Sequence, residues 1–175
     1  MKKLFTPLLS LVLVTGLFAQ AQSQITWKVN TKKAKITYNE TGSGAEGTFS
    51  GLEATIKFDP LKLSNSSIKA RIDAKSVTAK EDGQAGDIMS DEYLNVTKYP
   101  YITFESTNIE KKEGKFELTG KLTLKGKTKE IKVPFEFMKK NKTAIFKGKM
   151  TVSSKDFGLP AGDVYINLEV PVNQK

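Results

Sequence analysis

The stretch FELTGKLTL, from Phe116 to Leu124, alternates apolar and polar side chains and decides the fold class. Apolar residues and one glycine fall at every second position, and Glu, Thr and Lys fill the positions between. Successive side chains of a strand point to opposite faces, so the stretch predicts a β-strand with one buried and one solvated face. A Lys-Gly pair at 125–126 marks a turn, and IKVPFEF at 131–137 repeats the alternation.

The same alternation extends over most of the chain. Apolarity on one face only is typical of antiparallel sheets, because parallel strands are apolar on both faces and need crossover helices. About nine short strands in one domain predict a barrel or a sandwich. Proline donates no ladder hydrogen bond, so Pro134 and Pro171 each predict a strand edge, a strand start or a bulge. The other expected strands cover 25–30, 34–41, 52–58, 68–74, 101–109, 146–152 and 164–172.

One segment, residues 79–98, departs from the strand pattern. Met89, Tyr93 and Val96 have helical spacing, which predicts a glycine-containing loop followed by a short helix. Pro100 follows, and the residue before a proline avoids helical backbone angles, so the helix ends before it. A helix this short needs a surface to pack on. Two interpretations stay open: the helix plugs one end of a barrel, or it covers the entrance of a ligand site.

The 175-residue chain contains no His and no Cys. This excludes Ser-His-Asp triads, Cys-His dyads, zinc fingers and disulfide frameworks. Carboxylates remain for acid–base chemistry, but their spacing singles out no catalytic pair. We therefore expect a protein that is not an enzyme, has no catalytic residue or bound metal, and needs no cofactor. The carboxylates considered are Asp73, Asp82, Asp87, Asp91 and Glu92.

The N-terminus has the three parts of a secretory signal peptide. Two lysines follow Met1, residues 4–18 are apolar, and Ala-Gln-Ala at 19–21 is a cleavage site. An uncleaved membrane anchor is the alternative, although the apolar stretch is shorter than the roughly 20 residues that a span needs. We expect residues 1–21 to be removed and residues 22–175 to form a single domain. The expected location is the periplasm or the medium of a bacterium.

Four separated segments resemble the YceI-like family. They are KYPYITFES at 98–106, the preceding SDEYL at 90–94, GKLTLKGKTK at 120–129 and DFGL at 156–159. The resemblance runs from about residue 27 to residue 172 and keeps the family's order. It implies an all-β fold, an antiparallel lipocalin-like barrel of about eight strands with a short capping helix. It also implies an exported protein that binds polyisoprenoid or other long-chain lipids.

The chain departs from the family at three polar positions. Residues 84–88, QAGDI, stand where the family carries Arg and His; Lys33-Ala34 replaces a His-Ser pair, and Ser154 replaces an Arg. Contacts that those residues make to a lipid headgroup therefore do not carry over to this chain.

Inward-facing apolar side chains have two interpretations, a packed core or the lining of an apolar pocket. On the second, the protein carries a polyisoprenoid or a fatty-acyl chain in its interior. On the first, it is an exported barrel with a packed core and no ligand, and it serves interaction or stress tolerance. The candidate ligand-binding residues are Phe49, Ile56, Phe58, Ile72, Tyr93, Phe104, Leu122, Phe135, Phe137 and Phe146.

The formal net charge is +9, and Arg71 is the only arginine among 28 basic residues. Lysine lacks the planar fork that suits phosphate and base recognition, so nucleic acid is not an expected partner. The lysines mostly occupy outward strand positions, which predicts a solvated exterior. Transient attraction to an anionic membrane surface is the alternative. The sequence leaves the oligomeric state open, a homodimer included.

Overall fold

The computed structural model describes residues 24–160 and 162–175, and most of them lie in β-strands. The predicted signal peptide, residues 1–21, lies outside the described residues. The strands are β1 (Thr26–Val29), β2 (Lys35–Glu40), β3 (Glu46–Phe49), β4 (Glu53–Lys57), β5 (Ser67–Asp73), β6 (Thr78–Ala79), β7 (Tyr101–Lys112), β8 (Lys115–Leu124), β9 (Lys127–Lys140), β10 (Thr143–Ser153) and β11 (Asp163–Gln174). Helices in the described residues are α1 (Gln84–Met89), α2 (Ser154–Phe157) and the 3-10 turns η1 (Leu63–Asn65) and η2 (Ala74–Ser76).

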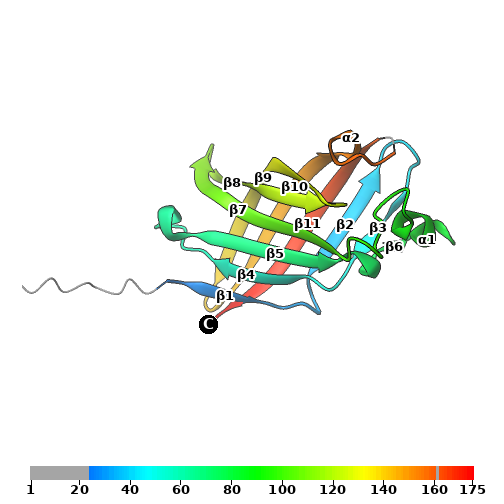
Figure 1. Cartoon of the computed structure of the whole chain (residues 1–175). Helices are drawn as coiled ribbons and strands as arrows, with labels where there is room; N and C mark the ends of the chain where they lie inside the picture. Colours follow the sequence, from blue (N-terminus) through cyan, green and yellow to red (C-terminus); the bar gives the residue numbers. More distant parts are fainter. Residues whose placement is uncertain (1–23, 161) are drawn as a thin grey trace, which may run out of the picture.

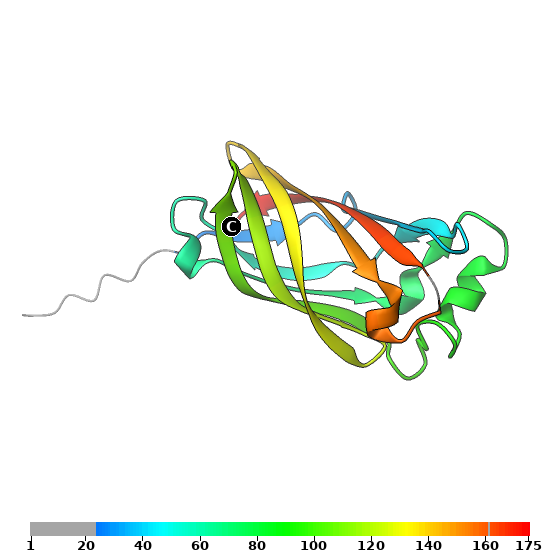
Figure 2. The ribbon, with the colours of Figure 1, turned by 90° about the horizontal axis from the view of Figure 1, so that it is seen from above.

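Eight strands close into an antiparallel barrel in the order β1-β4-β5-β7-β8-β9-β10-β11, with β11 pairing back to β1 (Figure 1). Strands β2, β3 and β6 extend the sheet from β11. This confirms the predicted all-β antiparallel barrel. All nine expected strands are present, and the sequence pattern missed only the short β3 and β6 among the described strands. The helices α1 and α2 lie at one end of the barrel, and the C-terminus lies at the other (Figure 2).

Both prolines lie where a strand changes or loses a neighbour. Strand β11 pairs with β2 as far as Glu169 and with β1 from Val172 onward, and Pro171 stands between these two ladders. Strand β9 pairs with β10 only from Phe135 to its end, so Pro134 stands where the two strands separate. At neither position does a backbone amide have to donate a hydrogen bond to a second neighbouring strand, so proline, which has no amide hydrogen, fits there.

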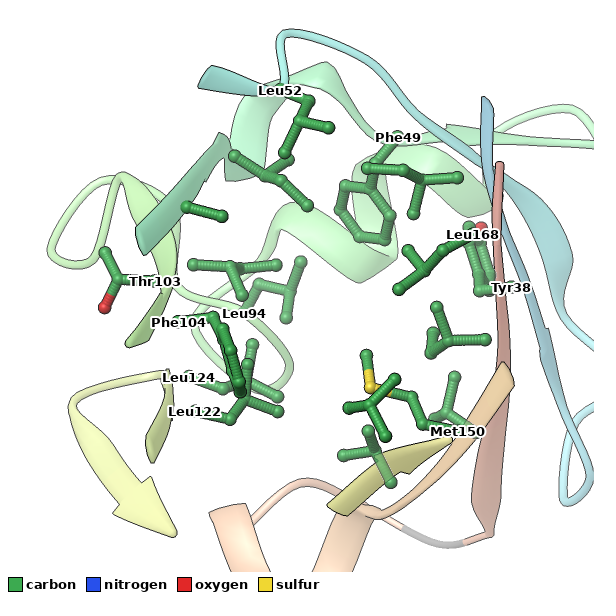
Figure 3. Close-up of a pocket in the computed structure, with 18 of the residues that line it drawn as sticks. Tyr38, Phe49, Leu52, Leu94, Thr103, Phe104, Leu122, Leu124, Met150 and Leu168 are labelled. Atoms are coloured by element: carbon green, nitrogen blue, oxygen red, sulfur yellow. The ribbon is translucent and has the colours of Figure 1, made fainter. Parts of the chain in front are cut away.

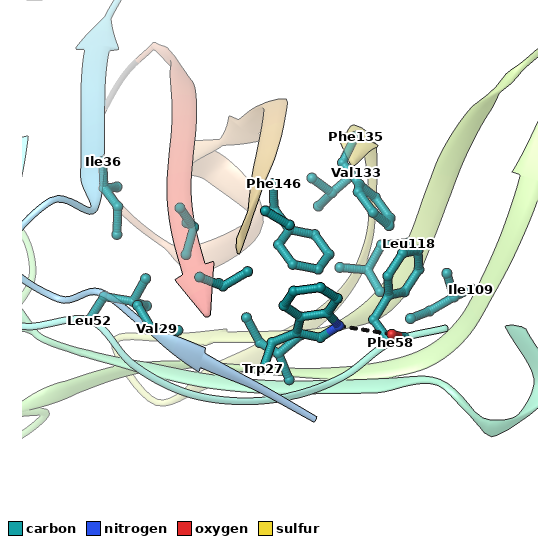
Figure 4. Packing of buried hydrophobic residues seen from close by; sticks show 14 residues of the cluster. Trp27, Val29, Ile36, Leu52, Phe58, Ile109, Leu118, Val133, Phe135 and Phe146 are labelled. Carbon is teal, nitrogen blue, oxygen red and sulfur yellow. Dashed lines mark hydrogen bonds between the residues drawn. The ribbon is translucent and has the colours of Figure 1, made fainter. Parts of the chain in front are cut away.

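The C-terminal end of the barrel is filled by aromatic side chains, here called the aromatic cluster (Figure 4). Phe58 is fully buried at its centre, and its ring centroid lies 4.9 Å from that of Phe137 and 5.3 Å from that of Phe146. The Trp27 indole donates a 2.9 Å hydrogen bond to the Phe58 carbonyl oxygen. Ring pairs of this geometry add about 0.5–1.5 kcal/mol each beyond area burial, so this end is a packed plug. The members are Trp27, Phe58, Phe116, Phe135, Phe137 and Phe146.

The opposite end is covered by residues 74–100, here called the capping segment. It holds a helix, as predicted, but the helix α1 ends at Met89, where the helical spacing of the sequence begins. After Ser90 the chain reverses: the Leu94 amide donates to the Ile88 carbonyl oxygen, and Asn95 adopts a left-handed backbone with φ 48°. Turns rather than a helix therefore bury Leu94 and Val96. No helix in the described part of the chain is long and apolar enough to span a membrane.

Candidate ligand-binding cavity

A cavity of about 420 Å³ lies between the aromatic cluster and the capping segment. Figure 3 shows part of its lining, with Leu94 of the capping segment and Phe104 and Met150 of the barrel. Its wall is almost entirely apolar and comes from most of the barrel strands. The aromatic cluster supplies its floor through Phe135 and Phe146, and the capping segment supplies its cover through Ile88, Tyr93 and Leu94. Cavities of about 300–1,000 Å³ with apolar walls and a few polar groups are typical of small-molecule sites.

Eight of the ten candidate residues named from the sequence line this cavity. Phe58 and Phe137 do not, and the expectation for these two is corrected. Both pack within the aromatic cluster, where Phe137 also makes an edge-on contact with Trp27 at 5.3 Å between centroids. They pack against the floor residues Phe135 and Phe146 on the side away from the cavity. The eight lining residues are Phe49, Ile56, Ile72, Tyr93, Phe104, Leu122, Phe135 and Phe146.

Sequence reasoning missed many aliphatic lining residues because it favoured aromatic side chains. The alternation along β10 would have identified them, since Phe146, Gly148, Met150 and Val152 follow one another on the inward face and all line the cavity. Gly148 leaves space there, because a Cβ atom at this position would lie 3.3 Å from Val133 Cγ1. The other missed aliphatic residues include Ile36, Leu52, Ile68, Ile102, Leu118, Leu124, Val164, Ile166, Leu168 and Val170.

One glycine shapes the wall by letting an aromatic ring lie flat. Gly120 on β8 faces the Phe104 ring of the neighbouring strand β7, and a Cβ atom at Gly120 would overlap that ring. Without the Cβ atom, Phe104 lies along the sheet instead of projecting across the barrel. The cavity is therefore wider at this depth than its aromatic lining alone would suggest.

Polar groups gather at the mouth, beside the turn after β2. The Tyr38 hydroxyl donates a 2.9 Å hydrogen bond to the Thr78 carbonyl oxygen of β6, and burial raises the pKa of Tyr38. The Glu40 carboxylate accepts hydrogen bonds of 2.6 Å from the amides of Gly42 and Ser43 and from the Ser43 hydroxyl. Burial raises the pKa of Glu40, but these hydrogen bonds outweigh it and hold that pKa below the ordinary value. The carboxylate is therefore charged near neutral pH.

A family model described as YceI-like domain matches residues 19–175. The chain belongs to the YceI-like family. It is 32% identical over 138 residues to a UPF0312 protein of Azotobacter vinelandii, a match that covers 75% of this chain and 70% of that protein. It is 29% identical over 163 residues to Protein YceI of Salmonella newport, covering 87% and 83%.

Solved structures share the barrel of this YceI-like chain. BcnA of Burkholderia cenocepacia superposes with a TM-score of 0.76 at 26% identity, over 82% of this chain and 99% of BcnA. The YceI protein of Campylobacter jejuni gives 0.67 at 26% identity, over 74% and 84%. A polyisoprenoid binding domain from Saccharophagus degradans gives 0.68 at 10% identity, over 87% and 100%, which demonstrates a common fold.

The cover of this YceI-like barrel is lightly packed near its entrance. Helix α1 has no buried residue, although Gln84, Asp87 and Ile88 line the cavity. Leu94 of the capping segment and Phe157 of α2 are 7% and 1% exposed. They pack in one cluster with side chains of β8 and β10. Few buried contacts therefore hold α1, whereas Leu94 and Phe157 are anchored in the core.

Lysine side chains of the exterior pair across strands. Lys69 of β5 and Glu105 of β7 lie 2.6 Å apart, and the hydrogen bond and charge of Lys69 lower the pKa of Glu105. Lys147 and Glu169 pair in the same way between β10 and β11, at 3.5 Å. Exposed pairs of this kind contribute little to stability, so burial must hold the fold. Within residues 24–160 and 162–175 no group of His, Cys, Asp or Glu side chains is arranged to hold a metal ion.

Proposed function

We propose that this protein is a carrier that binds a single long-chain lipid, of polyisoprenoid or fatty-acyl type, in the barrel interior and does no chemistry on it. The observation that carries the proposal is the apolar cavity of about 420 Å³ between an aromatic floor and the capping segment. Each methylene group moved from water into such a site contributes about 0.8 kcal/mol, before the cost of ordering the ligand.

The cavity volume sets a length for the bound chain. A group the size of a water molecule takes up about 30 Å³, so a cavity of about 420 Å³ holds about fourteen such groups. An acyl chain of about fourteen carbons, or about three isoprene units, fits the interior as it stands. The Saccharophagus degradans domain is described as polyisoprenoid binding, and a longer isoprenoid on this chain would extend through the mouth.

The proposal includes export. A basic start, an apolar stretch and an Ala-Gln-Ala site support removal of residues 1–21 and a periplasmic or secreted location. Mass spectrometry of the protein recovered from the periplasm or medium should give a chain that begins at Gln22. Recovery of the full chain with the inner membrane would contradict export.

Native mass spectrometry of protein purified from its own host tests lipid binding directly. We expect one lipid of the stated class per chain, and the same spectra give the oligomeric state. After delipidation, a fluorescent fatty-acyl probe should bind again. A protein that carries nothing and takes up no probe would favour the alternative, a barrel of interaction or stress tolerance without a ligand.

A pair of variants, one that fills the cavity and one matched control, tests where the probe binds. Ala70 lines the cavity on β5, so Ala70→Trp should abolish probe uptake by occupying the interior. Lys69→Trp adds the same side chain on the next residue, which is exposed on the outer face, and should leave uptake unchanged. Equal uptake by both variants would place the probe outside the barrel.

A further inference from the structure

The charged groups that line the cavity are unbalanced toward negative charge. They are Glu40, Asp87 and Arg71. The Arg71 guanidinium is half-exposed and already paired, with its Nη2 2.9 Å and its Nε 3.0 Å from a Glu53 carboxylate oxygen. It also lies 4.8 Å from the ring centroid of Tyr101. Two carboxylates therefore remain to face the polar end of a ligand.

A buried hydrogen-bond acceptor lies one helical turn from Asp87. The side-chain Oε1 of Gln84 is buried and has no hydrogen-bond partner among the described residues, and Gln84 lines the cavity. Asp87 follows it by three residues on α1, which places the two side chains on the same face of the helix. A buried acceptor without a partner is costly, so a donor on the ligand would be favoured here.

The described lysines lie outside the cavity lining. Residues 81–92 carry five acidic residues and no basic one. Lys80 pairs with Glu46 at 2.5 Å, whereas the Lys125 ammonium donates to the uncharged Glu92 carbonyl oxygen and keeps its charge outside the lining. The charged side chains of the cavity lining are thus net negative, on a molecule whose net charge is +9.

From this arrangement we infer that the polar end of the ligand is a neutral or cationic hydrogen-bond donor, such as an alcohol, a primary amide or an amine, and not a carboxylate or a phosphate. The inference rests on the proposed lipid-binding function. A donor group satisfies the Gln84 oxygen and is attracted by Asp87 and Glu40. An anionic group would meet the like charges of Glu40 and Asp87, which disfavours the ionised form.

A series of ligands with one chain length tests the inference. Tetradecanol, tetradecanamide and tetradecanoic acid would compete with the fluorescent probe at about pH 8, where the acid is ionised. We expect the alcohol and the amide to bind about tenfold more tightly than the acid. Equal or tighter binding of the acid would overturn the inference and leave the carrier function intact. If none of the three binds, both fall.

Two acidic residues of the capping segment provide a matched pair of variants. Asp87→Asn should improve binding of the acid several-fold, because it removes a carboxylate from the cavity wall. Asp82→Asn makes the same charge change outside the lining and should leave the preference unaltered. Equal effects of the two variants would mean that only overall charge matters and would overturn the inference.

A third variant tests the role of the Gln84 side-chain oxygen. Gln84→Leu should weaken the alcohol and the amide several-fold while leaving tetradecane, which has no polar end, unchanged. A uniform loss for all three ligands would show that Gln84 acts only through packing, which would contradict the role of its oxygen.

Discussion

Phe146 marks the boundary between the packed and the hollow parts of the barrel. On one side its ring contacts Phe137 at 4.8 Å and Phe58 at 5.3 Å between centroids, and on the other it lines the cavity. A single side chain thus belongs to the core and to the candidate site. Its size sets the depth to which a bound chain can extend.

Replacement of this floor residue should lengthen the site. Phe146→Ala removes a buried ring, so we expect a loss of about 3–5 kcal/mol in the free energy of unfolding. The chain length of tightest binding should rise by several carbons, measured by probe competition with fatty alcohols of increasing length. Phe116→Ala removes a ring of the same cluster that does not line the cavity, and should destabilise the fold without changing the preferred length.

The short strand β6 is one of the two strands that the sequence pattern missed, and it joins the capping segment to β3. It pairs with β3 through Gly47 and Thr48, where Gly47 permits the close approach because a Cβ atom would overlap the Thr78 carbonyl. The Tyr38 hydroxyl donates to that same carbonyl oxygen. The β3 pairing and the Tyr38 hydroxyl thus anchor the start of the capping segment, together with side-chain hydrogen bonds of Thr78 to Thr48 and of Ser76 to Ser50.

Loss of this hydrogen bond should loosen the cover. Tyr38→Phe is expected to cost about 1 kcal/mol in the free energy of unfolding. Hydrogen exchange should accelerate at the Lys80 amide, which donates to the Glu46 carbonyl oxygen beside β6, and the probe should dissociate faster. Tyr165→Phe, at an exposed tyrosine of β11, is the control. Unchanged exchange at Lys80 in Tyr38→Phe would show that the hydroxyl does not hold β6.

The elements also explain which parts of the site could be predicted from sequence. Alternation assigns each residue to the inner or outer face, so Phe135 and Phe137 look equivalent on β9. Only the stagger of the strands decides that Phe135 lies at the cavity floor and Phe137 behind it. The helix was misplaced for a similar reason, because Leu94 is buried by a backbone reversal at Asn95, which spacing alone does not encode.

At the scale of the whole molecule, the exterior and the interior of the barrel differ in character. The exterior is rich in lysine, which supports transient contact with an anionic membrane, while the interior is apolar. Coulombic attraction at an exposed surface is screened by salt, whereas burial of an acyl chain in a cavity is not. The two kinds of binding therefore separate experimentally by their response to ionic strength.

Flotation with lipid vesicles tests this separation. We expect the lipid-loaded protein to float with vesicles that contain phosphatidylglycerol at low salt, because each lysine near the surface contributes about 1 kcal/mol. It should not float with phosphatidylcholine vesicles. Raising the salt to about 1 M shortens the screening length to about 3 Å and should release the protein. Native mass spectrometry of the released protein should still find its lipid, since that ligand is held by apolar burial.

Flotation that persists at high salt would instead mean that apolar groups of the protein enter the bilayer. Loss of the internal lipid together with vesicle contact would mean that the ligand lies at the surface rather than in the barrel.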